Sequence, residues 1–299
     1  MRRKELSLRF VLMIGLLLSA CAASWGEPQK HLVVFMTDFG HLDDAVAICK
    51  GVMITVDPEV RIIDLIQDVT PYSIADGARF LAGTAPYYPE GTVFVVVIDP
   101  TVGSKRKAIV ARSKKGQYFV LPDNGLLTFV QDRDGIDAVY DIQNPKWMIG
   151  AGVSSTFHGR DIFSPAGAHV ARGDDIADAG PAMNAADLVR LKLPMAAVDN
   201  SGVTGQAFAI DGPFGNVITN IRREQFAKLG YALGDMVTLK LGDREMTLPW
   251  EKTFSDVPVG KTLLYVDSRG RMALAVNQGN FAKTYAITPP LAVTIPKKP

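Results

Sequence analysis

Up to about residue 200, short apolar runs alternate with longer segments in which apolar residues recur every three or four positions. Five strands are predicted here, at 31–36, 61–66, 92–98, 107–113 and 118–121. The third, T-V-F-V-V-V-I, has the continuous β-branched character of a strand buried on both faces. Helices are predicted at 43–56 and 74–84. This order predicts an α/β domain with a mainly parallel central sheet.

The pattern changes after the Leu-Pro pair at 193–194. Short β runs divided by Gly, Pro and Asp follow at 203–210, 236–241, 244–248, 262–267 and 272–276. Helical periodicity is nearly absent, so we expect a small antiparallel, barrel-like β domain. The predicted domains are therefore 27–198 and 199–299.

The first 26 residues read as an export leader. A basic start, M-R-R-K, precedes an apolar stretch at 10–18 that is shorter than the roughly 20 residues needed to span a bilayer. The stretch ends in L-S-A-C, which resembles the lipobox of a bacterial lipoprotein with Cys21 as the lipidated residue. The alternative is an ordinary secretory signal cleaved near Ala23 or Gly26. Either form predicts export to the bacterial cell envelope or periplasm.

Composition narrows the classes of function. A net charge of +1 gives no electrostatic basis for binding nucleic acid, and 47% hydrophobic residues are typical of a globular protein. Besides Cys21 the chain holds a single cysteine, Cys49, so neither a disulfide framework nor a zinc-binding spacing is present. Cys49 lies in the apolar run A-V-A-I-C and is predicted to be a buried hydrophobic residue.

Acidic loops follow two of the predicted parallel strands. The first strand leads into M-T-D-F-G-H-L-D-D-A-V at 36–46, and the strand at 92–98 leads into Asp99. Open α/β sheets bind ligands beyond the carboxyl ends of their strands. These loops are therefore the first place to expect a functional site.

Two familiar interpretations of the first loop can be compared. The tripeptide D-F-G at 38–40 cannot be that of a protein kinase, because only the leader and one strand precede it. The loop is also close to the calcium-binding pattern D-x-D-x-G-x-D-D of nucleoside hydrolases. It has Met36 in place of the first carboxylate and one extra residue before the Asp pair. A metal-dependent nucleoside hydrolase stays open as an alternative, although a thioether is a poor ligand for a hard cation.

Five further segments complete a third interpretation. They are I-D-P-T-V-G-S-K-R at 98–106, L-P-D-N-G-L-L at 121–127, S-T-F-H-G-R-D-I-F at 155–163, D-G-P-F-G-N-V-I-T-N at 211–220 and D-S-R-G-R at 267–271. In this order, together with T-D-F-G, they resemble the S-adenosylmethionine hydrolase and halogenase family. That family includes the S-adenosylmethionine hydroxide adenosyltransferases, the chlorinase and the fluorinase. The resemblance spans residues 32–285.

The resemblance implies substrate-binding residues in both predicted domains. In the first domain, Asp38 would hold both ribose hydroxyls, Asp43 would lie near the methionine portion and Tyr72 beside the ribose. The resemblance thus implies that the first acidic loop binds a sugar and needs no metal.

In the second domain, Asp211 would bind the amino group of methionine. Phe214 would face adenine, and Asn216 would hydrogen-bond the base. Ser268 and Arg269 would hold the amino-acid end. The resemblance also implies a homotrimer, with each site formed between subunits.

Asp99, Arg106 and His158 match the Asp-Arg-His set of the hydroxide-using branch. The halogenases place an aromatic residue at the position of Asp99, and a carboxylate beside a halide would repel it. One departure is Thr101, where the family usually has glycine. We therefore expect catalytic roles for Asp99, Arg106 and His158.

The expected reaction is attack of water or hydroxide on the ribose 5′ carbon of S-adenosylmethionine, giving adenosine and L-methionine without a cofactor or metal. Three alternatives stay open: a halogenase of the same family, the metal-dependent nucleoside hydrolase, and an exported lipoprotein that binds adenosine or S-adenosylmethionine without turnover. A complete water-activating set favours the hydrolase over a pure binding protein.

Overall fold

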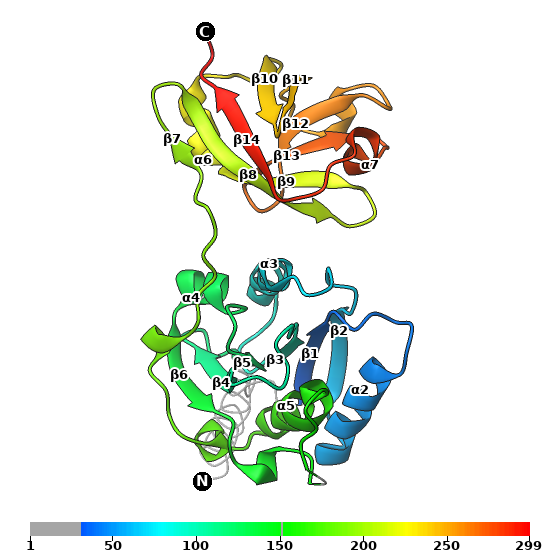
Figure 1. Ribbon diagram of the computed structural model, residues 1–299, viewed down its shortest axis with the longest axis vertical. Coiled ribbons are helices and arrows are strands. Elements are labelled where there is room, and N and C mark those ends of the chain that lie inside the picture. The colour runs from blue at the N-terminus through cyan, green and yellow to red at the C-terminus, as the bar shows by residue number, and fades with distance from the viewer. Residues whose placement is uncertain (1–30, 151) are drawn as a thin grey trace, which may run out of the picture. The chain divides into compact units, whose positions relative to one another are not determined.

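The computed structural model describes residues 31–150 and 152–299, which divide into two compact units after Leu191 (Figure 1). The predicted boundary, between 198 and 199, lies a few residues further along the chain. The leader, with Cys21 and the alternative cleavage positions, lies outside the described residues. None of the helices at 31–150 or 152–299 is long and apolar enough to cross a membrane.

The first unit is built on a six-stranded sheet in the order β2-β1-β3-β5-β4-β6. Its strands are β1 Leu32–Thr37, β2 Arg61–Ile66, β3 Val93–Val97, β4 Ala108–Ser113, β5 Tyr118–Pro122 and β6 Ile136–Asp141. The pairs β1/β2, β1/β3 and β3/β5 are parallel, whereas β4 runs antiparallel to both β5 and β6. The predicted α/β class and all five predicted strands are confirmed, and β6 was missed.

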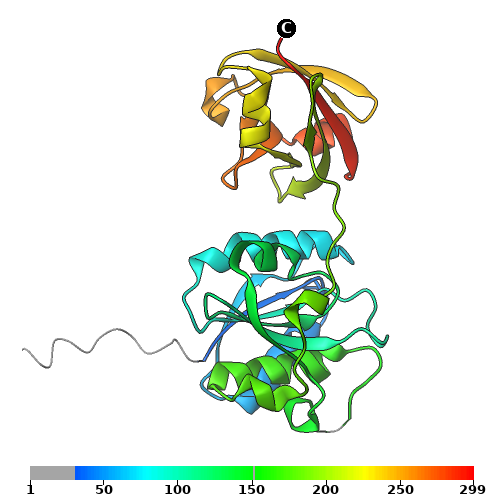
Figure 2. The same cartoon turned by 90° about the vertical axis from the view of Figure 1, so that its left-hand side faces the viewer.

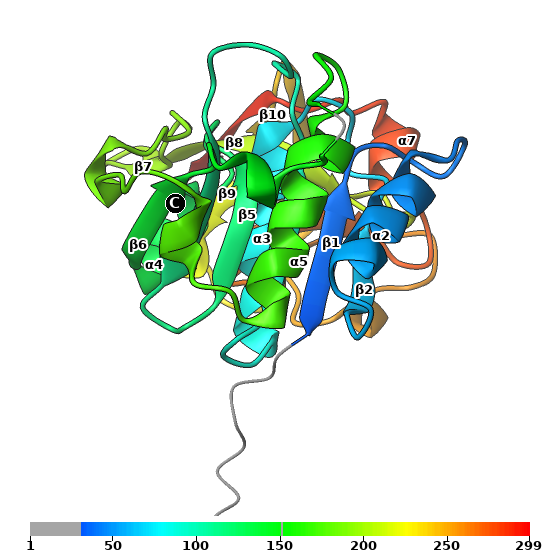
Figure 3. The same ribbon diagram turned by 90° about the horizontal axis from the view of Figure 1, so that it is seen from below.

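Helices cover both faces of this sheet. They are α2 Ala45–Val56, α3 Ile74–Thr84, α4 Thr128–Asp134 and α5 Ser164–Arg172. Alternate residues of β1 divide between the faces: Val33 packs in the core cluster that holds α2 and α5, and Val34 in the cluster that holds α3 and α4. Figure 3 shows α2 and α5 side by side on their face. Double coverage explains why β1 and β3 are buried at every position.

Cys49 on α2 is fully buried, as predicted. Burial raises the pKa of its thiol to about 11, so the group stays protonated at neutral pH. It behaves as a small core side chain.

The second unit is an antiparallel sheet in the order β11-β10-β14-β8-β9-β13-β12, with β7 paired to β8. Its strands are β7 Ala197–Val198, β8 Gly202–Asp211, β9 Asn216–Arg222, β10 Met236–Leu241, β11 Arg244–Pro249, β12 Thr262–Val266, β13 Arg271–Val276 and β14 Leu291–Pro296. Two short helices, α6 Arg223–Phe226 and α7 Phe281–Tyr285, complete it.

The sheet of the second unit curls into a nearly closed barrel (Figure 2). A bridge between Trp250, just after β11, and Leu264 of β12 joins the two outer strands. Apolar side chains fill the interior, with Val217, Leu239 and Phe281 among those that are almost fully buried. The predicted antiparallel, barrel-like class is confirmed.

Candidate active site

Asp99, Arg106 and His158 form one hydrogen-bonded cluster in the first unit. Asp99 follows β3, Arg106 lies in the loop before β4, and His158 immediately precedes a single π-helical turn at Gly159–Phe163. The Nε of Arg106 donates to Asp99 Oδ2 over 2.8 Å, and its Nη2 donates to the same oxygen. Only 8% of the Arg106 side chain and 4% of the Asp99 side chain are exposed. The ion pair is therefore largely shielded from solvent, which strengthens it.

The contact with Arg106 determines where neutral His158 carries its proton. Nη2 of Arg106 lies 2.7 Å from Nδ1 of His158. Because a guanidinium only donates, Nδ1 must accept, and neutral His158 then carries its hydrogen on Nε2. Burial and the positive charge of Arg106 lower the pKa of His158, partly offset by Asp99. The ring is therefore a neutral Nε2–H donor at neutral pH.

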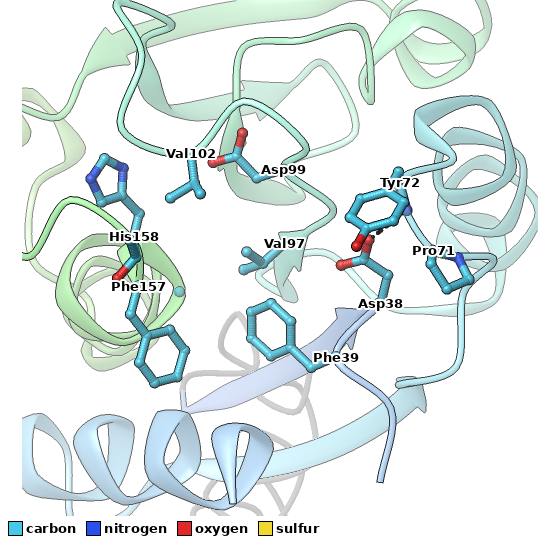
Figure 4. A pocket seen from close by; sticks show the side chains of 11 residues that line it. Asp38, Phe39, Pro71, Tyr72, Val97, Asp99, Val102, Phe157 and His158 are labelled. Atoms are coloured by element: carbon cyan, nitrogen blue, oxygen red, sulfur yellow. Dashed lines mark hydrogen bonds between the residues drawn. The ribbon is translucent and has the colours of Figure 1, made fainter. Parts of the chain in front are cut away.

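This cluster opens into a pocket of about 360 Å³ at the carboxyl ends of the parallel strands. Figure 4 shows Asp38 and Tyr72 at one side, His158 and Phe157 at the other, and Asp99 between them. The complete lining is Asp38, Phe39, Pro71, Tyr72, Val97, Asp99, Val102, Thr156, Phe157, His158 and Gly159. The pocket thus combines two carboxylates and an imidazole with an apolar floor.

Asp38 is held in place by the backbone of Tyr72. The amide of Tyr72 donates to Asp38 Oδ2 over 2.8 Å, and Tyr72 adopts a left-handed conformation with φ 67°. Such a φ is uncommon outside glycine and costs about 1–3 kcal/mol where the surrounding structure enforces it. Within the described residues, Oδ1 of Asp38 makes no hydrogen bond, so it can accept from a ligand hydroxyl.

Asp43 has a different environment. Its Oδ1 accepts from the amide of Ala45 over 3.0 Å, which satisfies a free N–H at the start of α2. Asp43 does not line the pocket that contains Asp38. A role beside the methionine portion stays a prediction for this residue.

Thr101 is accommodated in the loop after Asp99. It is not among the residues with positive φ, so this position does not require glycine. Its hydroxyl approaches Asp99 Oδ1 at 3.4 Å. The departure from the usual glycine thus adds a polar contact to the carboxylate.

The second unit has its own pocket, of about 880 Å³. Four of its five predicted site residues line it, namely Asp211, Phe214, Asn216 and Ser268. Arg269 is not part of the lining; its backbone amide donates to Asp267 Oδ1 over 2.8 Å.

Several other residues that were not predicted as site residues line the second pocket, among them Phe254, Tyr265 and Asp267. Phe254 and Tyr265 contact each other, with ring centroids 4.9 Å apart. Burial and two nearby carboxylates, Asp211 and Asp267, raise the pKa of Tyr265, so its hydroxyl stays protonated. Asp267 could have been found, because it begins the D-S-R-G-R segment. Phe254 belongs to none of the recognised motifs.

The chemistry of the two pockets differs. Aromatic rings and carboxylates in the second unit suit a flat base and a cationic amino group. In the first unit, a sugar-sized space lies beside an arginine-bound carboxylate and a neutral histidine. Among the described residues, no group of three or more His, Cys, Asp or Glu side chains could hold a metal ion.

Comparison with known proteins agrees with this geometry. Residues 33–180 match the model of the SAM hydroxide adenosyltransferase N-terminal domain, and residues 205–294 match that of the C-terminal domain. An (R)-S-adenosyl-L-methionine hydrolase of Salinispora arenicola is 40% identical over 86% of this chain and 94% of its own length. A fluorinase of Actinoplanes sp. is 33% identical over 89% of this chain and 97% of its own.

Solved structures show the same relationship. An uncharacterized conserved protein from Thermotoga maritima superimposes with a TM-score of 0.82 at 35% identity, covering 88% of this chain and 99% of that one. Both domain models match in order, and the likeness extends over nearly the whole described chain. The chain therefore belongs to the SAM hydroxide adenosyltransferase family.

Proposed function

We propose that this protein hydrolyses S-adenosyl-L-methionine to adenosine and L-methionine. The observation that carries the proposal is the hydrogen-bonded Asp99, Arg106 and His158 cluster. Two of its members, Asp99 and His158, line the same pocket as Asp38. Relatives at 40% and 39% identity are named (R)-S-adenosyl-L-methionine hydrolases. We extend that substrate, the epimer with R configuration at sulfur, to this chain.

The reaction is a displacement by water at the ribose 5′ carbon. The C5′–O bond forms as the C5′–S bond breaks, and the bonding electron pair returns to the sulfonium, which leaves as the neutral thioether of methionine. Because the sulfur is already positive, no acid is needed at the leaving group. Catalysis therefore depends on the position and preparation of the water.

The proposed roles follow from the hydrogen-bond chemistry of the cluster. The Nε2–H of His158, which also lies near the backbone carbonyl of Ser154, is assigned to the water oxygen, whose lone pair it would orient. Asp99 accepts the proton that the water loses and passes it to solvent. Neutral His158 cannot take this proton, because its Nδ1 already accepts a hydrogen bond from Arg106. Arg106 fixes the direction of the carboxylate through two donors.

The halogenase alternative is disfavoured by the charge of Asp99. A halide about 4 Å from a carboxylate would be repelled by roughly 4 kcal/mol at an effective dielectric constant near 20. Water gains a proton acceptor from the same group. Hydrolysis uses the carboxylate of Asp99 as a proton acceptor, whereas halogenation would have to overcome its repulsion of the halide.

Binding of the rest of the substrate is assigned to the second unit. Phe214 and Asn216 would contact adenine, and the carboxylates of Asp211 and Asp267 would balance the ammonium group. Following the family resemblance, we propose a homotrimer in which the first unit of one subunit and the second unit of a neighbour share each site. Asp38 would then bind the ribose hydroxyls.

Product analysis tests the function directly. We would incubate the purified protein with each sulfur epimer of S-adenosylmethionine in oxygen-18 water, with chloride and a chelator present, and identify the products by chromatography and mass spectrometry. We expect oxygen-18-labelled adenosine and methionine, formed from the R epimer and insensitive to the chelator. Chlorinated nucleoside would identify a halogenase, and free adenine would identify cleavage at the anomeric carbon. Tight binding without product would identify a binding protein.

We also propose export and lipid attachment at Cys21, on the basis of the L-S-A-C sequence. Cys21→Ser should move the protein from the membrane fraction to the soluble fraction and abolish incorporation of labelled palmitate. Cys49→Ala is the matched control, because it removes the other cysteine and should leave both properties unchanged. A wild-type protein that is soluble and unlabelled would instead support a cleaved secretory signal.

A further inference from the structure

The turn that follows β5 has no assigned role, although it lies next to the catalytic cluster. This turn, P-D-N-G at 122–125, lines neither pocket. It contacts both ends of the segment 98–107, which carries Asp99 and Arg106. Nδ2 of Asn124 donates to the carbonyl of Ile98 over 2.9 Å, and the amide of Asp123 donates to the carbonyl of Lys107 over 2.9 Å.

The side chain of Asn124 continues the hydrogen bonding between β3 and β5 beyond the end of their backbone pairing. Regular pairing of β3 with β5 ends at Val95 and Val120. Beyond that point the Asn124 amide takes the place of a backbone donor and satisfies the carbonyl of Ile98, a fully buried residue. A carbonyl only accepts, so the nitrogen of the amide, and not its oxygen, must face Ile98. The next residue along the chain is Asp99.

The turn is itself firmly held. Asp123 Oδ1 accepts from the amide of Val189 over 2.9 Å, and Thr128 Oγ1 donates to the carbonyl of Gly125 over 2.7 Å. Gly125 has φ 108°, and a Cβ there would lie 2.9 Å from Cγ of Leu191. Residues 189–191 thus pack against the turn, which in turn contacts both ends of the segment 98–107.

We propose that Asn124 is a positioning residue that aims the Asp99 carboxylate and the Arg106 guanidinium by anchoring the Ile98 carbonyl. The inference rests on the proposed hydrolysis and names a further residue for it. Asn124 does not touch substrate; it acts through the backbone that carries Asp99. A group misplaced by about 1 Å can cost on the order of 10²-fold in rate.

Asn124→Asp tests the donor with almost no change of shape. A carboxylate cannot donate to the Ile98 carbonyl, so we expect kcat to fall by about 10- to 100-fold with KM changed less than about twofold. At acidic pH the protonated carboxyl can donate again, so kcat relative to wild type should recover as the pH falls. Asn124→Ala should show the same loss without this recovery.

Asn144→Asp is the matched control. The Nδ2 of Asn144 donates to the carbonyl of Asp178 over 2.7 Å, and its Oδ1 accepts from Lys146 N, in the same unit but away from the pocket. This variant likewise loses one donor to a backbone carbonyl, and its kcat should equal that of wild type. A kcat of Asn124→Asp equal to wild type, or a loss without recovery in acid, would overturn the inference.

A measurement without turnover separates this inference from the proposed function. The chain has four histidines, so the ¹³Cε1 signal of His158 can be assigned by its disappearance in His158→Ala. In Asn124→Asp, movement of Arg106 away from His158 should raise the lowered pKa of the imidazole toward its ordinary value. An unchanged His158 titration would refute the positioning role, whatever reaction the wild-type protein performs.

Discussion

Replacing His158 with alanine should lower kcat by about 10²- to 10⁴-fold, the range typical for loss of one proton-handling group. The substitution removes the Nε2–H donor for the attacking water and leaves Nη2 of Arg106 without its second acceptor. The dissociation constant for S-adenosylmethionine, measured by calorimetry, should change little, because the ring meets the water and not the nucleoside. Unchanged turnover would remove His158 from the mechanism.

His169→Ala is the control for this variant. His169 lies in the same unit, with Nδ1 2.7 Å from Asp174 Oδ2, and does not line the pocket. Its replacement should leave kcat unchanged. A comparable loss in both variants would mean that the His158 effect reflects general destabilisation of the unit.

The pH dependence of turnover by the wild-type protein follows from the protonation of His158. Its pKa is lowered, so the neutral, active form persists below the ordinary value of 6.5. Turnover should therefore stay constant as the pH falls to 6.5 and decline only as the pH falls through the lowered pKa, when a proton on Nδ1 meets the Arg106 cation.

Replacing Asp38 with alanine should lower kcat/KM by about 10²- to 10⁴-fold. A hydrogen bond to a charged group contributes about 1.5–3 kcal/mol, two ribose hydroxyls are involved, and each 1.4 kcal/mol corresponds to a factor of ten. Steady-state kinetics measure the loss. The control is Asp137→Ala, which removes an exposed carboxylate paired with Arg112 at 3.0 Å in the same unit and should have no effect. Equal kinetics for Asp38→Ala and wild type would exclude Asp38 as the ribose ligand.

The same variant can test whether subunits share a site. Asp211→Ala should also be nearly inactive, because it removes the proposed partner of the methionine ammonium group. In a homotrimer with shared sites, co-expression of the two variants with different tags creates sites that combine an intact first unit with an intact second unit of a neighbour. Random assembly should restore roughly a quarter of the wild-type activity. No recovery in purified mixed oligomers would mean that each site belongs to a single chain.

Two of the strands that the sequence did not predict mix apolar and polar residues. The strand β6, I-D-A-V-Y-D, lies at a sheet edge with Asp137 exposed, so it lacks the continuous apolar run of β1 and β3. Strand β9 begins with Asn216 directly after a Gly-rich turn, and its sequence was taken as a binding motif. Mixed polarity weakens the periodic signal on which such predictions depend.

The sequence alone determined the fold class, the order of the two domains and the family, because buried strands must be apolar and the family motifs are local. It also named the residues of the Asp99 cluster, although only through resemblance. Tertiary structure alone brought these residues together: Arg106 reaches Asp99 across a loop, and His158 arrives from 52 positions further along the chain. The proton position on His158 and the anchoring of the catalytic loop by Asn124 follow from those contacts. They depend on where separate segments meet in space, and no periodicity along the chain encodes that meeting.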